Sequence, residues 1–258
     1  MTGAILGDIA GSRFEFSKPS GFNYKKVELF GNNCFFTDDT VLTIATKYAL
    51  LNDVSYAKAY GKFGRMYRDV GYGTMFQRWL DGHAETGYGS FGNGSAMRVS
   101  PVAWFAGSLD ECEKLAAATA EVTHNHPEGI KGAVAVAGAI YLARTGRSMA
   151  EIREYAERFY PIDFTLDEIR PDYDFVETCQ GSVPQALEAF FESTGFEDAI
   201  RNAVSIGGDS DTIADMAGAI AEAYYGADPE MKNIALSYLD LDLLDIAEEF
   251  ERRIILKA

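Results

Sequence analysis

The sequence predicts an all-α protein in which one domain, residues 1–258, forms a compact helical bundle. Apolar side chains recur with the 3.6-residue period of a helix, whereas the alternation typical of strands is almost absent. Two helical faces show this period: Val41, Ile44, Ala45 and Tyr48, and then Ile213, Met216, Ala217, Ile220 and Tyr224. No Pro/Gly/Ser-rich linker divides the chain, so we expect one large core.

Further helices are expected between short segments rich in Gly, Asn, Asp or Pro. They span residues 3–15, 55–70, 94–106, 110–122, 127–145, 148–159, 183–193 and 196–205, and a last apolar face contains Leu239, Leu243, Ile246 and Phe250. The segments 16–36 and 160–182 show no clear period, which indicates long surface loops. Gly3, Gly7 and Gly11 lie four residues apart in a run too short to span a membrane, so they indicate a closely packed buried helix.

Composition disfavours several classes of function. The formal charge of −16 works against binding to nucleic-acid backbones or anionic membranes, and an acidic excess suits a metal-binding protein. The three cysteines, Cys34, Cys112 and Cys179, have no C-x-x-C spacing, and the start of the chain lacks the basic region of a secretory signal. We therefore expect a cytoplasmic protein without membrane contact.

Two short acidic strings carry the main functional signal. Thr37-Asp38-Asp39-Thr40 opens the helix of Val41, and Asp209-Ser210-Asp211-Thr212 opens the helix of Ile213. Either string alone can be a helix cap. One cap residue suffices, however, and crowded carboxylates repel each other unless a cation or a proton neutralises them. If the two helix starts meet, their oxygens form a cage suited to Mg²⁺, Mn²⁺ or Ca²⁺.

Other metal sites fit the sequence less well. In an EF-hand beginning at Asp209, the sixth and twelfth positions require Gly and Glu, but Ala214 and Ile220 stand there. A zinc site would have to use the three histidines His83, His124 and His126, and hard oxygen ligands are the better match to the acidic strings.

Two carboxylates of the first helix have open roles. Glu15 ends the predicted helix and can equally be a surface group. Asp8 lies among small and apolar residues, and a buried carboxylate needs hydrogen-bond partners. We therefore expect Asp8 to accept hydrogen bonds from backbone groups or from a residue that supports a metal ligand.

A glycine-rich loop spans residues 87–92. Its letters match the G-x-G-x-x-G dinucleotide fingerprint, but no strand is predicted before it, so a Rossmann unit is not supported. The loop continues through Asn93 into the helix of Met97, where free N–H groups suit either a diphosphate or a plain helix start. No serine lies in a G-x-S-x-G setting and no cysteine pairs locally with histidine, which leaves metal-assisted hydrolysis.

Five motifs occur in order along the chain: GDIAGSRFE at 7–15, FTDDT at 36–40, GSFGNGSAMR at 89–98, TH at 123–124 and GGDSDTIADMAGAIAEAYYG at 207–226. Together they resemble the ADP-ribosylglycohydrolase family, which includes the dinitrogenase-reductase-activating glycohydrolases. The resemblance implies an all-α bundle of that type, two bound Mg²⁺ or Mn²⁺ ions, and hydrolysis of the N- or O-glycosidic bond at the anomeric carbon of ADP-ribose. ADP-ribose would be released from a modified protein or a small conjugate.

The resemblance also implies roles for individual residues. Thr37, Asp38 and Asp39 match ligands of one ion, Asp209 and Thr212 ligands of the other, and Asp211 a ligand shared by both, while Glu15 matches a mobile glutamate near the second ion. Ser90, Gly92 and Asn93 match positions that hold the diphosphate and distal ribose, Phe91 an aromatic that contacts the nucleoside, and His124 a substrate-pocket histidine.

In the implied reaction, water attacks the anomeric carbon and a carboxylate accepts its proton while others stabilise an oxocarbenium-like transition state. Glu15, Asp38 and Asp39 are the candidates, and spacing does not choose among them. The linkage also stays open, because segments 16–36 and 160–182 match nothing in better-known members. Arginine-, serine- and nucleobase-linked ADP-ribose and O-acyl esters are all alternatives.

Two rival functions are a non-catalytic ADP-ribose-binding relative of the same fold and a helical phosphohydrolase. The complete set of matched metal-ligand positions argues against the first. The second usually uses adjacent His-Asp pairs, and this chain has none.

Overall fold

The structure is a computed structural model that describes residues 1–16, 23–82 and 86–256. In this part of the chain the regular structure is helical, apart from an isolated bridge between Gly92 and Thr178, and the predicted all-α class is confirmed. The first helices are α1 (Gly3–Gly11), α2 (Asp38–Asn52), α3 (Tyr56–Met66), α4 (Thr74–Asp81), α5 (Gly94–Met97), α6 (Ser100–Phe105), α7 (Leu109–Glu121) and α8 (Pro127–Arg144). The later ones are α9 (Met149–Glu157), α10 (Leu166–Ile169), α11 (Cys179–Phe191), α12 (Phe196–Ile206), α13 (Ser210–Tyr225), α14 (Pro229–Leu236) and α15 (Leu241–Ile255).

Several predicted boundaries were wrong. The first helix ends at Gly11 rather than at residue 15, because the chain turns there and the Phe14 N–H donates to the Gly11 carbonyl. The predicted helix 94–106 is two short helices, and α4 and α14 were not predicted. Segment 160–182 contains α10, whose Thr165 and Glu168 form a capping box, and the first residues of α11.

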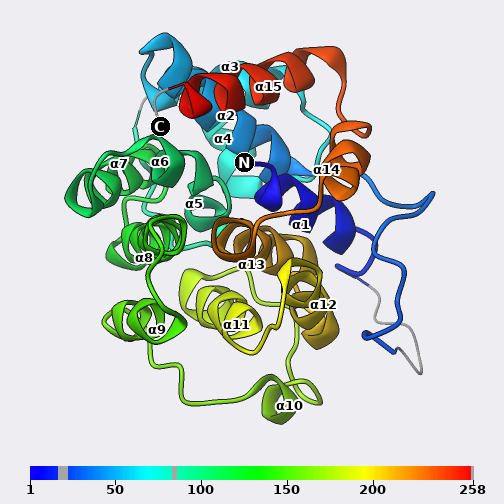
Figure 1. The fold of residues 1–258 in the computed structure, drawn as a ribbon. Coiled ribbons are helices and arrows are strands. Elements are labelled where there is room, and N and C mark those ends of the chain that lie inside the picture. The colour runs from blue at the N-terminus through cyan, green and yellow to red at the C-terminus, as the bar shows by residue number, and fades with distance from the viewer. Residues whose placement is uncertain (17–22, 83–85, 257–258) are drawn as a thin grey trace.

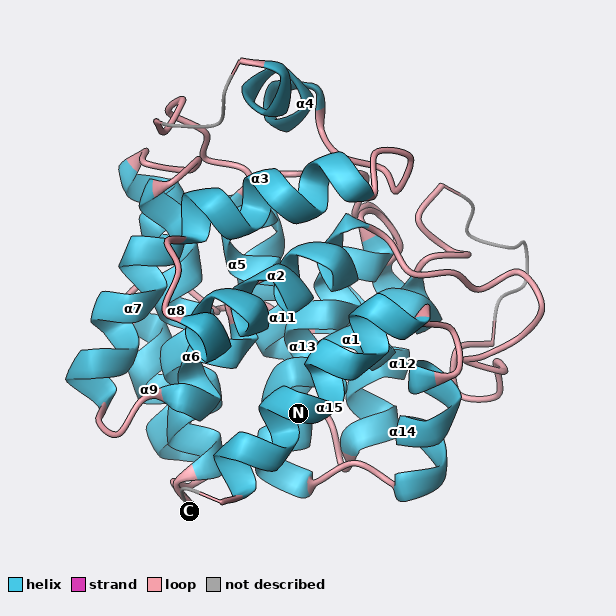
Figure 2. Ribbon diagram, turned by 90° about the horizontal axis from the view of Figure 1, so that it is seen from above, coloured by secondary structure: helices cyan, strands magenta, loops and turns pink. Residues whose placement is uncertain are grey.

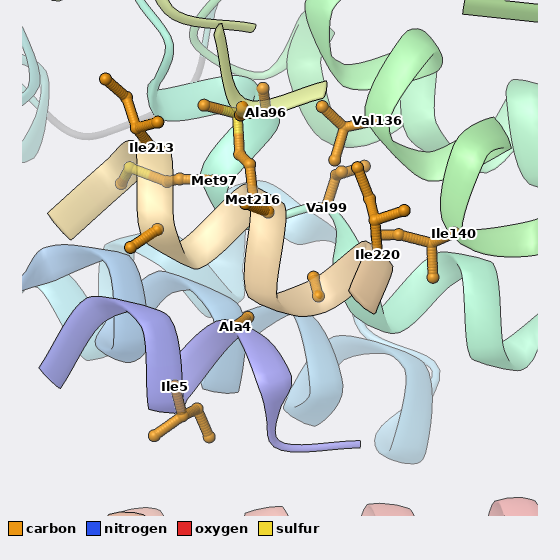
Figure 3. Close-up of a cluster of buried hydrophobic side chains, with 14 of the residues drawn as sticks. Ala4, Ile5, Ala96, Met97, Val99, Val136, Ile140, Ile213, Met216 and Ile220 are labelled. Carbon is orange, nitrogen blue, oxygen red and sulfur yellow. The ribbon is translucent and has the colours of Figure 1, made fainter. Parts of the chain in front are cut away.

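Helix α13 lies at the centre of the molecule, as both ribbon views show (Figures 1 and 2). Every residue from Ser210 to Glu222 is buried, which is the expected pattern for a helix enclosed on all sides. Its neighbours include α1, α8, α11 and α12. On one side, Met216 and Ile220 meet apolar side chains of α5 and α8, among them Val136 and Ile140, as Figure 3 shows.

Helix α1 packs directly against α13 through its three spaced glycines. A Cβ on Gly3 would lie 2.4 Å from the Gly218 carbonyl oxygen, one on Gly7 2.0 Å from that of Ala214, and one on Gly11 2.4 Å from that of Ser210. The two backbones are therefore in contact along the whole of α1, and the predicted close packing of this helix is confirmed. Among the described helices, none combines the length and apolar character needed to cross a membrane.

We predict that Gly7→Ala lowers the free energy of unfolding by at least about 2 kcal/mol, because the added methyl overlaps backbone that cannot move away. Gly107→Ala is the matched control, since its Cβ would find only an ordinary contact at 3.5 Å from the Glu111 carboxylate. Chemical denaturation of both variants measures the difference, and equal stabilities would contradict the close approach.

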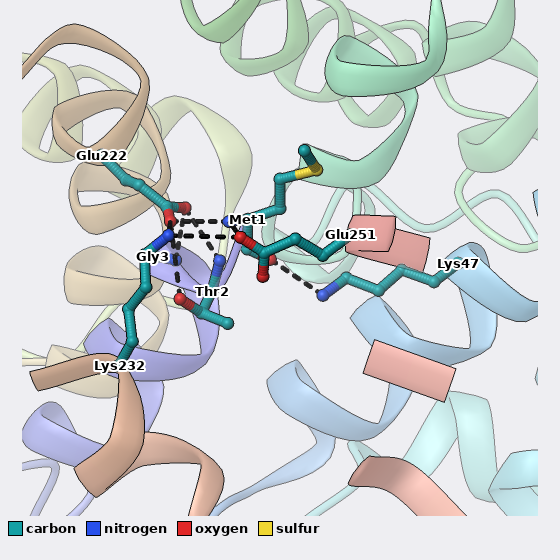
Figure 4. Close-up of polar contacts among 7 residues, drawn as sticks. All are labelled: Met1, Thr2, Gly3, Lys47, Glu222, Lys232 and Glu251. Atoms are coloured by element: carbon teal, nitrogen blue, oxygen red, sulfur yellow. Dashed lines mark hydrogen bonds and ion pairs between the residues drawn. The ribbon is translucent and has the colours of Figure 1, made fainter. Parts of the chain in front are cut away.

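A buried ion cluster holds the start of α1 (Figure 4). The Met1 amino group lies 2.7 Å from Glu222 Oε1, and the backbone N–H groups of Thr2 and Gly3 donate to Glu222 Oε2 at 2.8 and 2.7 Å. Lys232 lies 3.2 Å from the same carboxylate. Burial by itself would raise the pKa of Glu222, but the amino group, Lys232 and the N–H donors together lower it to about 2.

This cluster predicts a pH dependence of stability. The folded pKa of Glu222 lies below its ordinary value of 4.5, so its stabilisation is fully present above pH 4.5 and is lost as the pH falls toward 2. Glu222→Gln should cost about 3 kcal/mol at neutral pH, and the difference from wild type should shrink across that interval. Glu248→Gln, an exposed change, is the control. Unfolding curves between pH 2 and 7 measure both, and a constant Glu222→Gln difference would contradict the assignment.

Candidate active site

The structure brings the two acidic strings together where α2 and α13 begin. The Thr212 hydroxyl lies 3.3 Å from Asp39 Oδ1, although the two residues are 173 positions apart in sequence. Thr37 is the N-cap of α2 and accepts a hydrogen bond from the Asp39 N–H, so the capping interpretation holds for this threonine. The carboxylates of Asp39 and Asp211 are not needed for that cap, and they face each other in a buried space.

Asp8, in helix α1, forms hydrogen bonds with the first residues of α2. Its Oδ1 accepts the Thr37 hydroxyl proton at 2.8 Å, and its Oδ2 accepts the N–H groups of Thr37 and Thr40 at 2.9 and 3.1 Å as well as the Thr40 hydroxyl. Both oxygens of this fully buried carboxylate are thus used by neighbouring donors. The structural role expected for Asp8 is observed.

Two groups of carboxylates share Asp211. Oxygens of Asp8, Asp39 and Asp211 lie within 4.8 Å of one another, and so do oxygens of Glu15, Asp209 and Asp211. Asp39 Oδ2 and Asp211 Oδ1 are buried without a hydrogen-bond partner among the described residues. Buried acceptors of this kind are costly unless something binds them. Both groups are therefore arrangements that could hold a metal ion.

The same crowding shifts the pKa values of these acids upward. Burial, followed by repulsion from Asp211, raises the pKa of Asp39 well above its usual range, and burial with repulsion from Asp209 does so for Asp211. Burial and the charge of Asp209 raise the pKa of Glu15 to about 7, and burial and Asp8 raise that of Asp38 to about 8. A cation would relieve this repulsion by neutralising the charged forms.

The glycine-rich loop closes another side of the site. Asn93 Nδ2 donates to Asp209 Oδ2 at 2.6 Å and to the Ser182 hydroxyl at 3.1 Å. The Asn93 N–H donates to the Glu177 carbonyl at 2.8 Å, which ties the loop to the segment before α11. Of the matched substrate positions, Asn93 therefore lies beside the carboxylates.

The remaining matched positions line the same loop. The Ser90 hydroxyl accepts the Gly92 N–H at 3.1 Å, and His124 is buried with Nε2 facing Gly92 and Gly94. Phe91 is 44 % exposed and its ring lies 5.4 Å from that of His126. Of the three histidines weighed for zinc, His83 lies outside the described residues.

A hollow of about 350 Å³ adjoins Glu15. Phe16, which is 82 % exposed, stacks on Phe175 at 5.8 Å at this hollow, and Tyr173 and Asp174 also line it. Residues from both predicted loop segments, 16–36 and 160–182, line this hollow, so both contribute to the surroundings of the acidic site.

Sequence reasoning missed three groups near the site. Asp215 lies one turn after Asp211 and is fully buried, with both oxygens unpartnered among the described residues. Its i, i+4 spacing from Asp211 was a readable signal. Ser182 and Glu177 come from the segment 160–182, and no sequence signal placed them beside Asn93.

Comparison with known proteins agrees with this geometry. The family model described as ADP-ribosylglycohydrolase matches residues 1–253. The chain belongs to the ADP-ribosylglycohydrolase family. It is accordingly a hydrolase acting on glycosyl bonds.

Individual relatives of this glycohydrolase are moderately similar. Human ADP-ribosylhydrolase ARH3 is 27% identical over 341 residues, covering 100% of this chain and 93% of the human protein. The ADP-ribosyl-[dinitrogen reductase] glycohydrolase of Rhodospirillum rubrum is 32% identical, covering 59% of this chain and 52% of that protein. A solved structure, an ADP-ribosylglycohydrolase-related protein complex, has a TM-score of 0.74 and 26% identity, covering 97% of this chain and 94% of that chain.

The Asp8 network generates a prediction about stability. Asp8→Ala should lower the free energy of unfolding by at least about 3 kcal/mol, because it leaves four donors of Thr37 and Thr40 without an acceptor in a buried place. Asp8→Asn should cost much less, since its amide oxygen can replace Oδ2 and its NH₂ can donate to the Thr37 hydroxyl oxygen. Thermal and chemical unfolding measure both variants. Equal losses would show that the charge of Asp8, rather than its hydrogen bonds, stabilises the fold.

Proposed function

We propose that this glycohydrolase removes ADP-ribose from a modified protein by hydrolysis at the anomeric carbon, with two Mg²⁺ or Mn²⁺ ions held by the acidic strings. The observation that carries the proposal is the pair of carboxylate groups that share Asp211. Oxygen-only ligand sets suit these hard cations better than zinc or copper. The buried Asp39 Oδ2 and Asp211 Oδ1 fit such ions because no hydrogen-bond donor in the described protein contacts them.

The proposed ligands follow the motif match, and three of them, Asp39, Asp209 and Asp211, also belong to the two carboxylate groups. Thr37, Asp38 and Asp39 would hold one ion, Asp209 and Thr212 the other, and Asp211 both, with Glu15 near the second ion. Asp8 lies in one of the two carboxylate groups, but its oxygens already accept hydrogen bonds, so we assign it the positioning of α2. A bound divalent ion supplies Lewis-acid polarisation and makes hydroxide available near neutral pH.

Proton transfer and stabilisation of the developing charge are carried out by the protein's own carboxylates. A carboxylate among Glu15, Asp38 and Asp39 accepts a proton from the attacking water as the new C–O bond forms at the anomeric carbon. The bond to the leaving group breaks at the same carbon, and the neighbouring carboxylates stabilise the positive charge that develops there. The proton then passes to the departing nitrogen or oxygen.

Substrate orientation is assigned to the glycine-rich loop. Ser90, Gly92 and Asn93 would hold the diphosphate and distal ribose, Phe91 would contact the nucleoside, and His124 would line the pocket. Asn93 lies at this place because its amide donates to Asp209 and Ser182, which leaves its Oδ1 as an acceptor for a ribose hydroxyl.

Two broader assignments accompany this function. We place the protein in the cytoplasm, because its three cysteines are unpaired and buried, as expected in a reducing compartment. Residues 1–258 act as one domain, and small ADP-ribose conjugates and ADP-ribosylated nucleic acid are the alternatives to a protein substrate.

The test is release of free ADP-ribose from arginine-, serine- and nucleic-acid-linked conjugates with Mg²⁺, with Mn²⁺ and with chelator. We expect metal-dependent release from one class. Asp211→Asn should reduce it by at least about 10³-fold while the circular dichroism spectrum is unchanged, because the shared ligand is lost but no core side chain is.

The matched control is Asp245→Asn, an exposed change on α15 that should retain wild-type turnover. Turnover by Asp211→Asn at the wild-type rate would overturn the two-ion assignment. Release that is equally fast with chelator would overturn the metal dependence.

A further inference from the structure

Arg98 is a fully buried cation that no carboxylate pairs with among the described residues. Its guanidinium lies over the Tyr60 ring at 4.2 Å, and Nη2 donates to the Thr119 carbonyl at 2.9 Å and to the Thr123 hydroxyl at 2.6 Å. Its Nε and Nη1 atoms have no partner within the described protein. A buried arginine is rare without an ionic partner, and here its shortest hydrogen bond goes to the hydroxyl of Thr123.

The Thr123 hydroxyl also contacts the next residue, His124. Its hydroxyl oxygen lies 2.7 Å from His124 Nδ1. A guanidinium can only donate hydrogen bonds, so the oxygen of Thr123 accepts from Arg98. Accepting a hydrogen bond from the Arg98 cation polarises the Thr123 O–H bond, which favours donation of its proton to His124 Nδ1.

The other nitrogen of His124 faces the glycine-rich loop. A Cβ on Gly94 would lie 3.1 Å from Nε2, and one on Gly92 would lie 3.5 Å from it. This nitrogen forms no hydrogen bond with any described residue. Burial and the Arg98 guanidinium lower the pKa of His124 well below its usual range, so the imidazole is neutral and carries one proton.

We propose that Arg98 and Thr123 hold His124 in the tautomer with its proton on Nε2, so that the ring offers a hydrogen-bond donor to an anionic ligand at the glycine-rich loop. Arg98 and Thr123 are positioning residues, since neither needs to touch the ligand. Naming the anion as the diphosphate of ADP-ribose rests on the proposed function.

The tautomer decides what His124 can recognise. With Nδ1 accepting from Thr123, Nε2–H complements phosphate oxygens, which only accept. In the opposite tautomer, Nε2 would present a lone pair to those oxygens and repel them. A neutral donor also avoids placing a second full charge beside the buried Arg98.

The test is the protonation of His124 nitrogens by long-range ¹H–¹⁵N NMR on the full-length protein labelled at histidine. The chain has three histidines, so a His124→Gln sample assigns the signals. We expect wild-type His124 to be protonated at Nε2 in the free protein. Thr123→Val should move it toward protonation at Nδ1, whereas Thr123→Ser, which keeps the hydroxyl, should match wild type.

Affinity for ADP-ribose provides the second readout. Thr123→Val should weaken binding roughly tenfold, and Thr123→Ser should stay within about twofold of wild type. Wild-type protonation at Nδ1, an unchanged tautomer in Thr123→Val, or unchanged affinity once the tautomer has moved would each overturn the inference. The tautomer is measured without ligand, so failure of ADP-ribose release would contradict the proposed function separately.

Discussion

The backbone contact between α1 and α13 is the constraint on which the rest of the structure depends. Gly3, Gly7 and Gly11 allow the two helices to approach until their backbones touch, and no residue with a side chain fits at these positions. This approach places Asp8 beside the start of α2 and Glu15 beside Asp209 and Asp211. The close approach of α1 to α13 therefore fixes where Asp8 and Glu15 lie relative to Asp211.

The resulting site concentrates negative charge where water is largely excluded. Asp39 and Asp211 are buried and repel each other, which raises their pKa values and makes an empty, fully charged site unfavourable. The opposite end of α1 is held by a balanced cluster, in which Glu222 meets an amino group, Lys232 and two N–H donors. The Glu222 cluster thus stabilises one end of α1, while the crowded carboxylates lie at the other end.

The sequence predicted the helical class and the importance of both acidic strings, because helical period and excess carboxylates are local signals. The sequence alone could not say whether the two acidic strings lie together. The 3.3 Å distance between the Thr212 hydroxyl and Asp39 shows that they do. The contribution of segment 160–182 to the site could not be predicted, for a physical reason. Its residues Glu177 and Ser182 gain their roles only from Asn93, which is distant in sequence, and no period marks such a contact.

Small errors had the same origin. The glycine spacing was read correctly as close packing, but the point at which α1 ends depends on the turn at Gly11 and not on helix propensity. Asp215 could have been found from its spacing to Asp211, whereas the chain from Arg98 through Thr123 to His124 required knowing which side chains are buried together.

The pairing of α1 with α13 also has a consequence for how the protein folds. These helices, Gly3–Gly11 and Ser210–Tyr225, are far apart in the sequence, yet their contact is the most extensive between any two described helices. Contacts of such long sequence separation form slowly, because a large loop must close before they contribute stability. During synthesis, residues 3–11 have no main packing partner until residues 210–225 have emerged. Assembly of the acidic centre therefore waits for residues 210–225, and the nascent chain carries the two acidic strings apart from each other until then.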